Sequence, residues 1–178
     1  KDLMESQPSG AGKMLGAEAL ALAESQLSQR FDGVHGGFGD SRKFPVPHEL
    51  RFLLRRGQSE PMGDAVRMVT KTLDGWRLGG IFDHVGFGMH RYSTDAEWLL
   101  PHFEKMLYDQ GQLLRTYAEA WRRSGASDDD LAWPVRETAE WLKDLMHRDG
   151  LPAEFHELDA GPPVVFGHLQ AKRPAKTI

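Results

Sequence analysis

The sequence predicts an all-α domain of stacked helical hairpins. Apolar residues recur at the three- and four-residue spacing of one helix face in four long stretches. Glycine pairs follow two of these stretches, at Gly36-Gly37 and Gly79-Gly80, and glycine after a helix supplies the left-handed residue that ends it. No stretch alternates apolar and polar residues for long enough to predict a convincing strand. A unit of helix, glycine turn and large apolar residue that recurs in this way favours helical hairpins, none of which buries its faces alone.

The apolar pattern predicts five helices. A short one follows Pro47, and the third begins at Glu60-Pro61, because proline suits the first helical position. Pro101 opens the fourth helix, and the acidic run Asp128-Asp129-Asp130 favours the N-terminus of the fifth. Pro134 places the regular part of the fifth helix close to that proline. The apolar stripes lie at residues 15–27, 50–54, 62–76, 103–121 and 131–145.

Composition limits the protein class. The 178 residues are enough for one domain, and 40% hydrophobic residues can form a core. The net charge of -4 excludes the strongly basic surface of a dedicated nucleic-acid binder. No apolar run reaches the roughly 18 residues that a membrane-spanning helix needs. Cysteine is absent, which excludes disulfides and thiol catalysis within these residues and favours a cytoplasmic location.

The ends of the sequence lack the helical pattern. Residues 1–13 are expected to be a flexible lead-in, residues 14–147 the helical region, and residues 148–178 an irregular tail. No signal peptide is visible, and Val164–Phe166 is too short to form a sheet alone. The tail is typical of a chain cut from, or diverging from, something larger.

The residues with chemical potential are concentrated between Gly79 and Asp109. This segment holds three of the eight histidines together with several carboxylates, and such groups need hydrogen-bond partners if they are buried. On a helix from Pro101, Glu104 and Tyr108 would share a flank, and Lys105 would lie close enough to Asp109 to pair. A solvated helix face remains the alternative interpretation. The polar groups are Asp83, His84, His90, Arg91, Asp95, His102, Glu104, Lys105, Tyr108 and Asp109.

Several blocks of this sequence resemble one family. They are Gly36–Gly39 with Lys43-Phe44-Pro45, Gly79–His84, His90–Asp95, and the string from Trp98 through His102-Phe-Glu-Lys-Met-Leu-Tyr-Asp109. Together they resemble the thioredoxin-domain-containing family typified by the spermatogenesis-associated thioredoxin-like protein and its bacterial relatives. The resemblance runs roughly from residue 31 to residue 121.

The resemblance implies a partial (α/α)6 toroid, similar to sugar 2-epimerases and six-hairpin glycosidases. The sequence contains neither the family's thioredoxin-like domain nor its cysteine motif, and five helices stand where a closed toroid has twelve. It also departs from the family pattern at Phe87 and at Gln110. An incomplete toroid would expose flanks that invite self-association. The missing thioredoxin-like and toroid segments are therefore candidate partners.

The resemblance also implies a sugar site, because epimerases of similar fold move a proton beside a carbonyl with histidine. Glu104 or Asp83 would orient an imidazole, and Arg91 would bind hydroxyls or a carboxylate. A glycosidase would instead use two of the carboxylates. The expected catalytic residues are His84, His90, His102, Glu104 and Asp83. The expected substrate-binding residues are Arg91, Trp98, Tyr108, Asp95 and Asp109.

The alternative hypothesis is a non-catalytic scaffold or interaction domain, in which the same polar residues form a structural network that fixes helix packing. Neither a cofactor nor a metal is expected, since the sequence has no phosphate-binding loop and no close spacing of metal ligands. A small-molecule sugar is the expected ligand, and neither nucleic acid nor a membrane is an expected partner.

Overall fold

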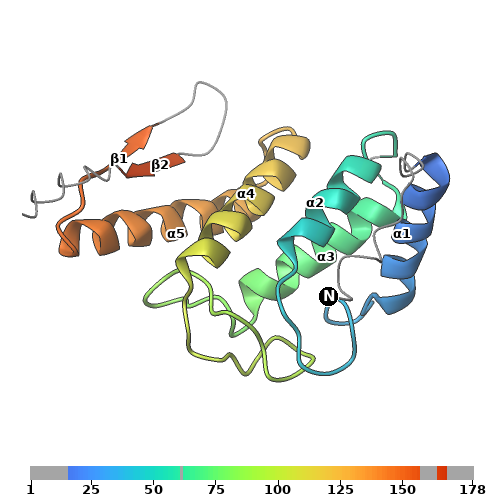
Figure 1. Cartoon of the computed structure of the whole chain (residues 1–178), viewed down its shortest axis with the longest axis horizontal. Helices are drawn as coiled ribbons and strands as arrows, with labels where there is room; N and C mark the ends of the chain where they lie inside the picture. Colours follow the sequence, from blue (N-terminus) through green and yellow to red (C-terminus); the bar gives the residue numbers. More distant parts are fainter. Residues whose placement is uncertain (1–15, 61, 157–163, 168–178) are drawn as a thin grey trace, which may run out of the picture.

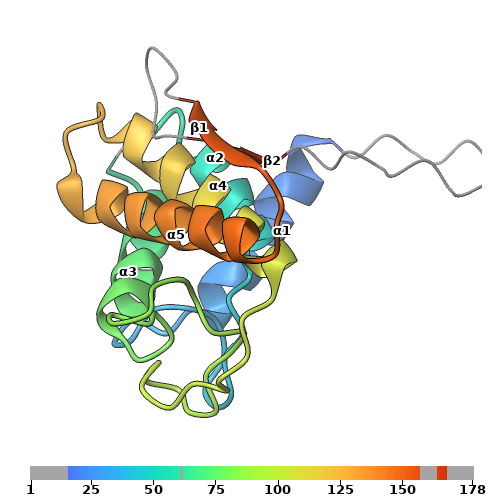
Figure 2. The same ribbon diagram turned by 90° about the vertical axis from the view of Figure 1, so that its left-hand side faces the viewer.

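The computed structural model describes residues 16–60, 62–156 and 164–167. It contains five α-helices and one pair of short strands (Figures 1 and 2). The bounds are α1 Ala17–Arg30, α2 Pro47–Arg56, α3 Asp64–Leu78, α4 Leu107–Arg123, α5 Asp129–Arg148, β1 Ala153–His156 and β2 Val164–Gly167. The all-α prediction is confirmed for the body of the molecule. No described helix is long and apolar enough to cross a bilayer.

Consecutive helices run in opposite directions, and the helices form two layers (Figure 1). The helices α2 and α4 pack together in one layer, α1 and α3 pack together in the other, and α2 also contacts α3. Short connections join α2 to α3 and α4 to α5, whereas long loops join α1 to α2 (residues 31–46) and α3 to α4 (residues 79–106). Figure 1 shows both long loops at the same end of the helices. Residues far apart in sequence are thereby gathered at that end.

The core lies between the layers and continues under the long loops. Trp76 of α3 is fully buried and meets Trp98 and Tyr117 edge to face, with ring centroids 6.0 and 6.4 Å apart. The Tyr117 hydroxyl donates to the Leu73 carbonyl at 2.7 Å, so α4 is hydrogen-bonded to α3. Burial raises the pKa of Tyr117 well above its usual value.

Local sequence explains how two of the helices begin. Pro47 occupies the first turn of α2, as expected. The Asp128 side chain accepts a hydrogen bond from the Asp130 amide and caps α5. Pro134 lies inside this helix, so α5 begins before the proline that was expected to mark the start of its regular part.

The fourth helix begins six residues later than predicted, at Leu107 rather than Pro101. The intervening backbone pairs with the long loop instead: the His102 amide donates to the Tyr92 carbonyl, and the Glu104 carbonyl accepts from the Arg91 amide. These groups are therefore unavailable for the first turn of a helix. Phe103, assigned to the apolar face, is 82% exposed.

The C-terminal segment also differs from expectation. Strands β1 and β2 pair antiparallel, with Phe155 opposite Val165, and lie against α5. The prediction of an irregular tail is thus wrong for residues 153–156 and 164–167. The apolar residues 164–166 pair with a strand that lies about ten residues earlier in the chain. The lead-in of residues 1–13 and the rest of the tail, residues 157–163 and 168–178, lie outside the described residues.

Candidate functional site at the long-loop end

The two long loops begin with the same local structure. In the first, Phe31 pairs with Phe38, and the Asp32 amide donates to the Gly37 carbonyl at 2.9 Å. In the second, Phe82 pairs with Met89, and the Asp83 amide donates to the Gly88 carbonyl at 3.0 Å. Each aspartate also accepts two hydrogen bonds from amides two and three residues further on. Each loop is thus organised around an aspartate and closed by a glycine.

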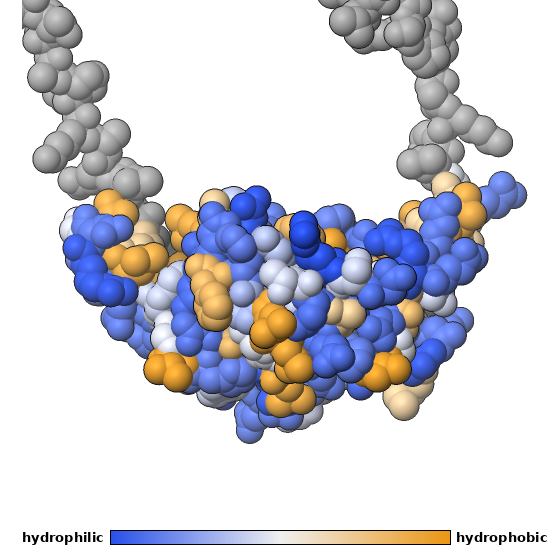
Figure 3. Space-filling model, turned by 90° about the horizontal axis from the view of Figure 1, so that it is seen from below, coloured by the Kyte–Doolittle hydropathy of each residue, from blue (hydrophilic) through white to orange (hydrophobic). Residues whose placement is uncertain are grey.

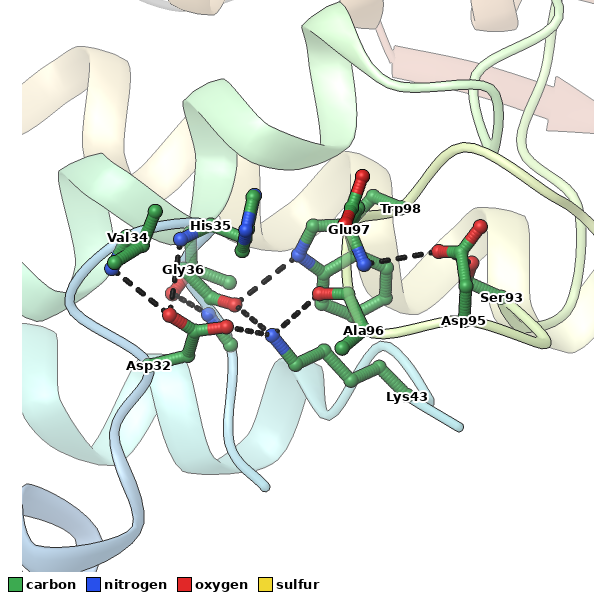
Figure 4. A network of polar contacts seen from close by, with 12 residues as sticks. Asp32, Val34, His35, Gly36, Lys43, Ser93, Asp95, Ala96, Glu97 and Trp98 are labelled. Carbon is green, nitrogen blue, oxygen red and sulfur yellow. Dashed lines mark hydrogen bonds and ion pairs between the residues drawn. The ribbon is translucent and has the colours of Figure 1, made fainter. Parts of the chain in front are cut away.

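A buried lysine completes the first loop (Figure 4). The Lys43 ammonium donates to Asp32 Oδ2 at 2.5 Å, to the Gly36 carbonyl at 3.0 Å and to the Ala96 carbonyl at 2.7 Å. These three acceptors match the three donors of an ammonium group. Burial would raise the pKa of Asp32, but the hydrogen bonds from Lys43 and from the loop amides outweigh it and lower the pKa to about 2.

Trp98 belongs to this buried network. Its side chain is fully buried, and the indole nitrogen donates to the Gly36 carbonyl at 3.1 Å (Figure 4). The Lys43 ammonium lies 5.6 Å from the centre of its ring. The prediction that Trp98 forms a wall for a sugar ring is therefore wrong, because a ligand cannot reach the ring.

Asp95 organises the backbone of the second loop. Its Oδ1 accepts from the Ser93 hydroxyl and from the amides of Glu97 and Leu99, and its Oδ2 accepts from the Leu100 amide. Burial opposes ionisation of Asp95, but these donors together lower its pKa. Both carboxylate oxygens are occupied by the loop, so the expected substrate contact is replaced by a structural one.

Asp83 pairs with Lys105. The ammonium group donates to Asp83 Oδ2 at 2.7 Å and to the Phe87 carbonyl at 2.5 Å, and it lies 5.0 Å from the centre of the Trp141 ring. Although burial acts to raise the pKa of Asp83, hydrogen bonds from Lys105 and the loop amides lower it to about 2. Two predictions are wrong here: Asp83 does not orient an imidazole, and Lys105 does not pair with Asp109.

The three candidate histidines lie in three different environments. His84 contacts the Arg77 carbonyl at 2.9 Å and stacks on Trp133 of α5. His90 is only 7% exposed and packs against the edge of Phe103, and its Nδ1 has no hydrogen-bond partner among the described residues. Burial, reinforced by the Lys105 charge, lowers the pKa of His90. His102 is exposed and forms contacts with Tyr92 and Glu104.

Three backbone segments pair side by side under His102. Lys43 pairs with Ser93, and Ser93 pairs in turn with Pro101, all in antiparallel orientation. Side chains alternate between the two faces of such a pairing. Because Lys43 and Ser93 point into the core, the residues that flank them point outward. The outward set comprises Arg42, Phe44, Tyr92, Thr94, Leu100 and His102.

Three of these outward side chains stack as a row that we call the aromatic platform: Phe44, Tyr92 and His102. The rings of Phe44 and Tyr92 are 4.5 Å apart and tilted by 27°, and those of Tyr92 and His102 are 4.8 Å apart and tilted by 13°. The buried Lys43 network fixes the backbone beneath them.

An ion pair borders the platform. Arg91 Nη1 lies 3.1 Å from Glu104 Oε2, and the same oxygen lies 3.8 Å from His102 Nδ1. All three side chains are between two fifths and one half exposed. The hydrogen bond that Arg91 donates to Glu104, together with the negative charges nearby, raises the pKa of Arg91. The predicted residues Arg91, His102 and Glu104 thus come together, at the surface.

The first turn of α4 supplies the last two candidates. Tyr108 is exposed, and Asp109 is half-buried with one oxygen, Oδ2, that no described residue hydrogen-bonds. Burial raises the pKa of Asp109, opposed by the charge of Arg91 and reinforced by that of Glu104.

Sequence reasoning missed Arg42, Phe44 and Tyr92 as members of the site. Inward and outward side chains alternate around Lys43 and Ser93, which is the pattern of a strand. Each alternating stretch is only three residues long, too short to predict a strand from the sequence. The face that carries the platform is mostly hydrophilic with interspersed apolar side chains, as Figure 3 shows from the long-loop end. Among the described residues, no group of three or more His, Asp or Glu side chains is placed to hold a metal ion.

Comparison with known proteins yields relatives in sequence and in structure. No family model matches the chain. An uncharacterized protein of Caenorhabditis elegans is 40% identical over 137 residues, which are 75% of this chain and 19% of that protein. Human spermatogenesis-associated protein 20 is 39% identical over 142 residues, 77% of this chain and 18% of the relative, and the mouse protein of that name is 40% identical. The chain spans about a fifth of the length of these relatives.

In structure, the chain resembles the cellobiose 2-epimerase of Spirochaeta thermophila. The TM-score is 0.56 at 18% sequence identity, and the match covers 71% of this chain and 36% of the epimerase. At this identity the likeness is one of fold. The chain therefore has the architecture of part of an α/α toroid of the six-hairpin glycosidase type, and its sequence is similar to that of spermatogenesis-associated protein 20.

Proposed function

We propose that the protein binds a carbohydrate at the aromatic platform. The observation that carries the proposal is the row of stacked, partly exposed rings with the Arg91–Glu104 pair at its border. Aromatic side chains present flat apolar area, and a few placed polar groups fix the orientation of a ligand. A sugar has both surfaces that such a site recognises, an apolar ring face and a rim of hydroxyl groups.

The polar residues have separate roles in this proposal. Arg91 donates to ligand hydroxyls, and Glu104 accepts from them while holding the Arg91 guanidinium in place. Tyr108 and Asp109 extend the site along the first turn of α4. If the bound sugar is also modified, His102 is the general acid or base, because it is exposed and has Glu104 beside Nδ1 to orient the ring.

The setting of the site is part of the proposal. We place the domain within a longer protein, in which further toroid hairpins and a thioredoxin-like domain are its neighbours. The absence of cysteine from these 178 residues favours the cytoplasm. Cell fractionation followed by detection of the native protein tests this location.

Isothermal titration calorimetry tests the binding. The protein is titrated with neutral hexoses, N-acyl hexosamines and cellobiose, alongside the variants Tyr92→Ala and Glu104→Gln. We expect saturable binding of at least one sugar, and a loss of at least tenfold in affinity in both variants. His84→Ala is the matched control, because His84 stacks on α5 away from the platform. Absence of heat with every sugar, or equal loss in the control, contradicts the proposal.

A second candidate function is an interaction domain without a small ligand. It is favoured by large apolar side chains that are more than half exposed near the long-loop end: Leu99, Leu100, Phe103 and Leu107. In this case the sugar titrations are silent, and sedimentation velocity detects self-association that Phe103→Ser weakens. A monomer at all concentrations speaks against self-association.

A further inference from the structure

We propose that the ligand of the platform carries an anionic substituent, a carboxylate or a phosphate, and that Arg42 binds it. This inference rests on the proposed function and adds to it the chemical class of the sugar and one binding residue. The class would be uronic acids or sugar phosphates rather than neutral sugars.

Arg42 is held at the platform by the backbone. It precedes Lys43, whose amide donates to the Ser93 carbonyl at 3.0 Å and whose carbonyl accepts from the Ser93 amide at 2.8 Å. This pairing sets Arg42 on the outward face with Tyr92. The Arg42 guanidinium carbon lies 5.7 Å from the centre of the Tyr92 ring, within the range of a cation–π contact.

Within the part of the chain that the structure describes, no carboxylate neutralises the charge of Arg42. Its side chain is exposed, and no carboxylate among the described residues lies within ion-pair distance of it. Arg91, by contrast, is compensated by Glu104 at 3.1 Å. The site thus offers one guanidinium paired with a carboxylate, that of Arg91, and one that contacts the Tyr92 ring without such a pair among the described residues, that of Arg42.

A guanidinium group in this setting selects for an anion. Its planar donors match carboxylate and phosphate oxygens two at a time, which a neutral hydroxyl cannot reproduce. The stacked rings supply the apolar contact for the ligand ring, and Arg42 supplies the charge beside it.

Calorimetric titrations with glucuronate, glucose 6-phosphate, glucose and inorganic phosphate test the inference. The proteins are the unaltered chain, Arg42→Gln, Arg42→Lys and, as a matched control, Arg136→Gln on the exposed face of α5. We expect glucuronate or glucose 6-phosphate to bind at least tenfold tighter than glucose. Arg42→Gln should remove this advantage, Arg42→Lys should restore part of it, and Arg136→Gln should leave it intact. The tighter of the two anionic sugars identifies the substituent.

The outcomes separate this inference from the proposed function. Equal affinity for glucose and the anionic sugars, unchanged in Arg42→Gln, overturns the inference and leaves sugar binding standing. Binding of inorganic phosphate alone, lost in Arg42→Gln, supports the anion site and contradicts the sugar proposal. No binding of any of the four compounds overturns both. Circular dichroism of Arg42→Gln should match the unaltered protein, since the side chain is exposed.

Discussion

The two long loops use the same aspartate–lysine pair at different depths. Lys43 in the first loop has a side chain with 0% exposure and donates to three acceptors. Lys105 in the second loop is 18% exposed and donates to two acceptors among the described residues. Each ammonium faces a tryptophan, Trp98 in the first loop and Trp141 in the second.

The difference shows how one hairpin depends on the next. The third acceptor of Lys43 is the Ala96 carbonyl, and its tryptophan is Trp98, so the second loop covers the first. The second loop is covered in turn by Trp141 of α5. A stack in which each unit is completed by its successor is consistent with the toroid architecture. The platform takes Phe44 from the first loop and Tyr92 and His102 from the second, and the Lys43–Ser93 pairing joins these segments beside the more deeply buried pair.

Replacing the lysine of either loop should have the largest effect on stability, and the effect should differ between the two loops. Lys43→Met leaves the Asp32 carboxylate without its partner in the interior, and we expect a loss of about 3–5 kcal/mol in the free energy of unfolding. Lys105→Met should cost about 1.5–3 kcal/mol, because the partner carboxylate keeps some contact with solvent. Urea denaturation followed by circular dichroism measures both. Equal losses in the free energy of unfolding would show that the difference in burial between the two lysines does not affect stability.

Alanine substitution of the glycine that closes each loop tests the same difference in burial between the two loops. Gly37 and Gly88 both have φ of 78°, where alanine costs about 1–2 kcal/mol. A Cβ at Gly37 would overlap the buried Trp98 ring, whereas one at Gly88 would lie 3.0 Å from the half-buried Trp141 ring. We expect overpacking to add about 1–3 kcal/mol to Gly37→Ala only. A larger loss of thermal stability in Gly88→Ala would contradict this order.

Acid should weaken both pairs together. The pKa values of Asp32 and Asp83 are about 2 in the folded protein against a usual 3.8. Because the folded pKa is lowered, the stability from each pair is present above pH 3.8 and is lost as the pH falls towards 2. Each shift corresponds to about 2 kcal/mol at neutral pH. The free energy of unfolding, measured by urea at several pH values, should fall less steeply below pH 3.8 in Asp32→Asn than in the unaltered protein.

The smallest effect on stability is expected at the border of the platform. The Arg91–Glu104 pair is about two fifths exposed, and exposed pairs contribute less than about 1 kcal/mol. Glu104→Gln should therefore unfold at nearly the same urea concentration as the unaltered protein while losing sugar affinity. A large loss of stability in this variant would assign Glu104 to the structural framework instead.

The sequence was sufficient for the helices because their apolar stripes are long. Periodicity located all five helical segments, but the start of α4 was misplaced because Phe103 and Met106 continue the apolar spacing while the backbone of residues 101–104 pairs elsewhere. The spacing of apolar residues does not indicate that a backbone segment is hydrogen-bonded to another segment ten residues away. The paired strands at the C-terminus were missed for the same reason.

The sequence predicted which kinds of residue form the site, but it did not predict which of them lie together. Arg91, His102 and Glu104 come together as expected, whereas Asp83 and Asp95 are used by the loops. Both groups contain carboxylates, so residue type alone does not separate Glu104 from Asp83 and Asp95. The register of the Lys43–Ser93 pairing sets which of the side chains around it point outward. That register depends on contacts between loops 50 residues apart.

We propose that the long-loop end divides into a buried interior framework and an outward platform that binds a sugar. Amide chemical-shift mapping of the ¹⁵N-labelled protein during titration with glucuronate tests it most directly. We expect saturable shifts of the amides of Arg42, Arg91, Tyr92, His102 and Glu104, and no shift of the amides of Asp32 and Trp98. Shifts confined to the surroundings of Trp141, or no shifts at saturating sugar, would contradict it.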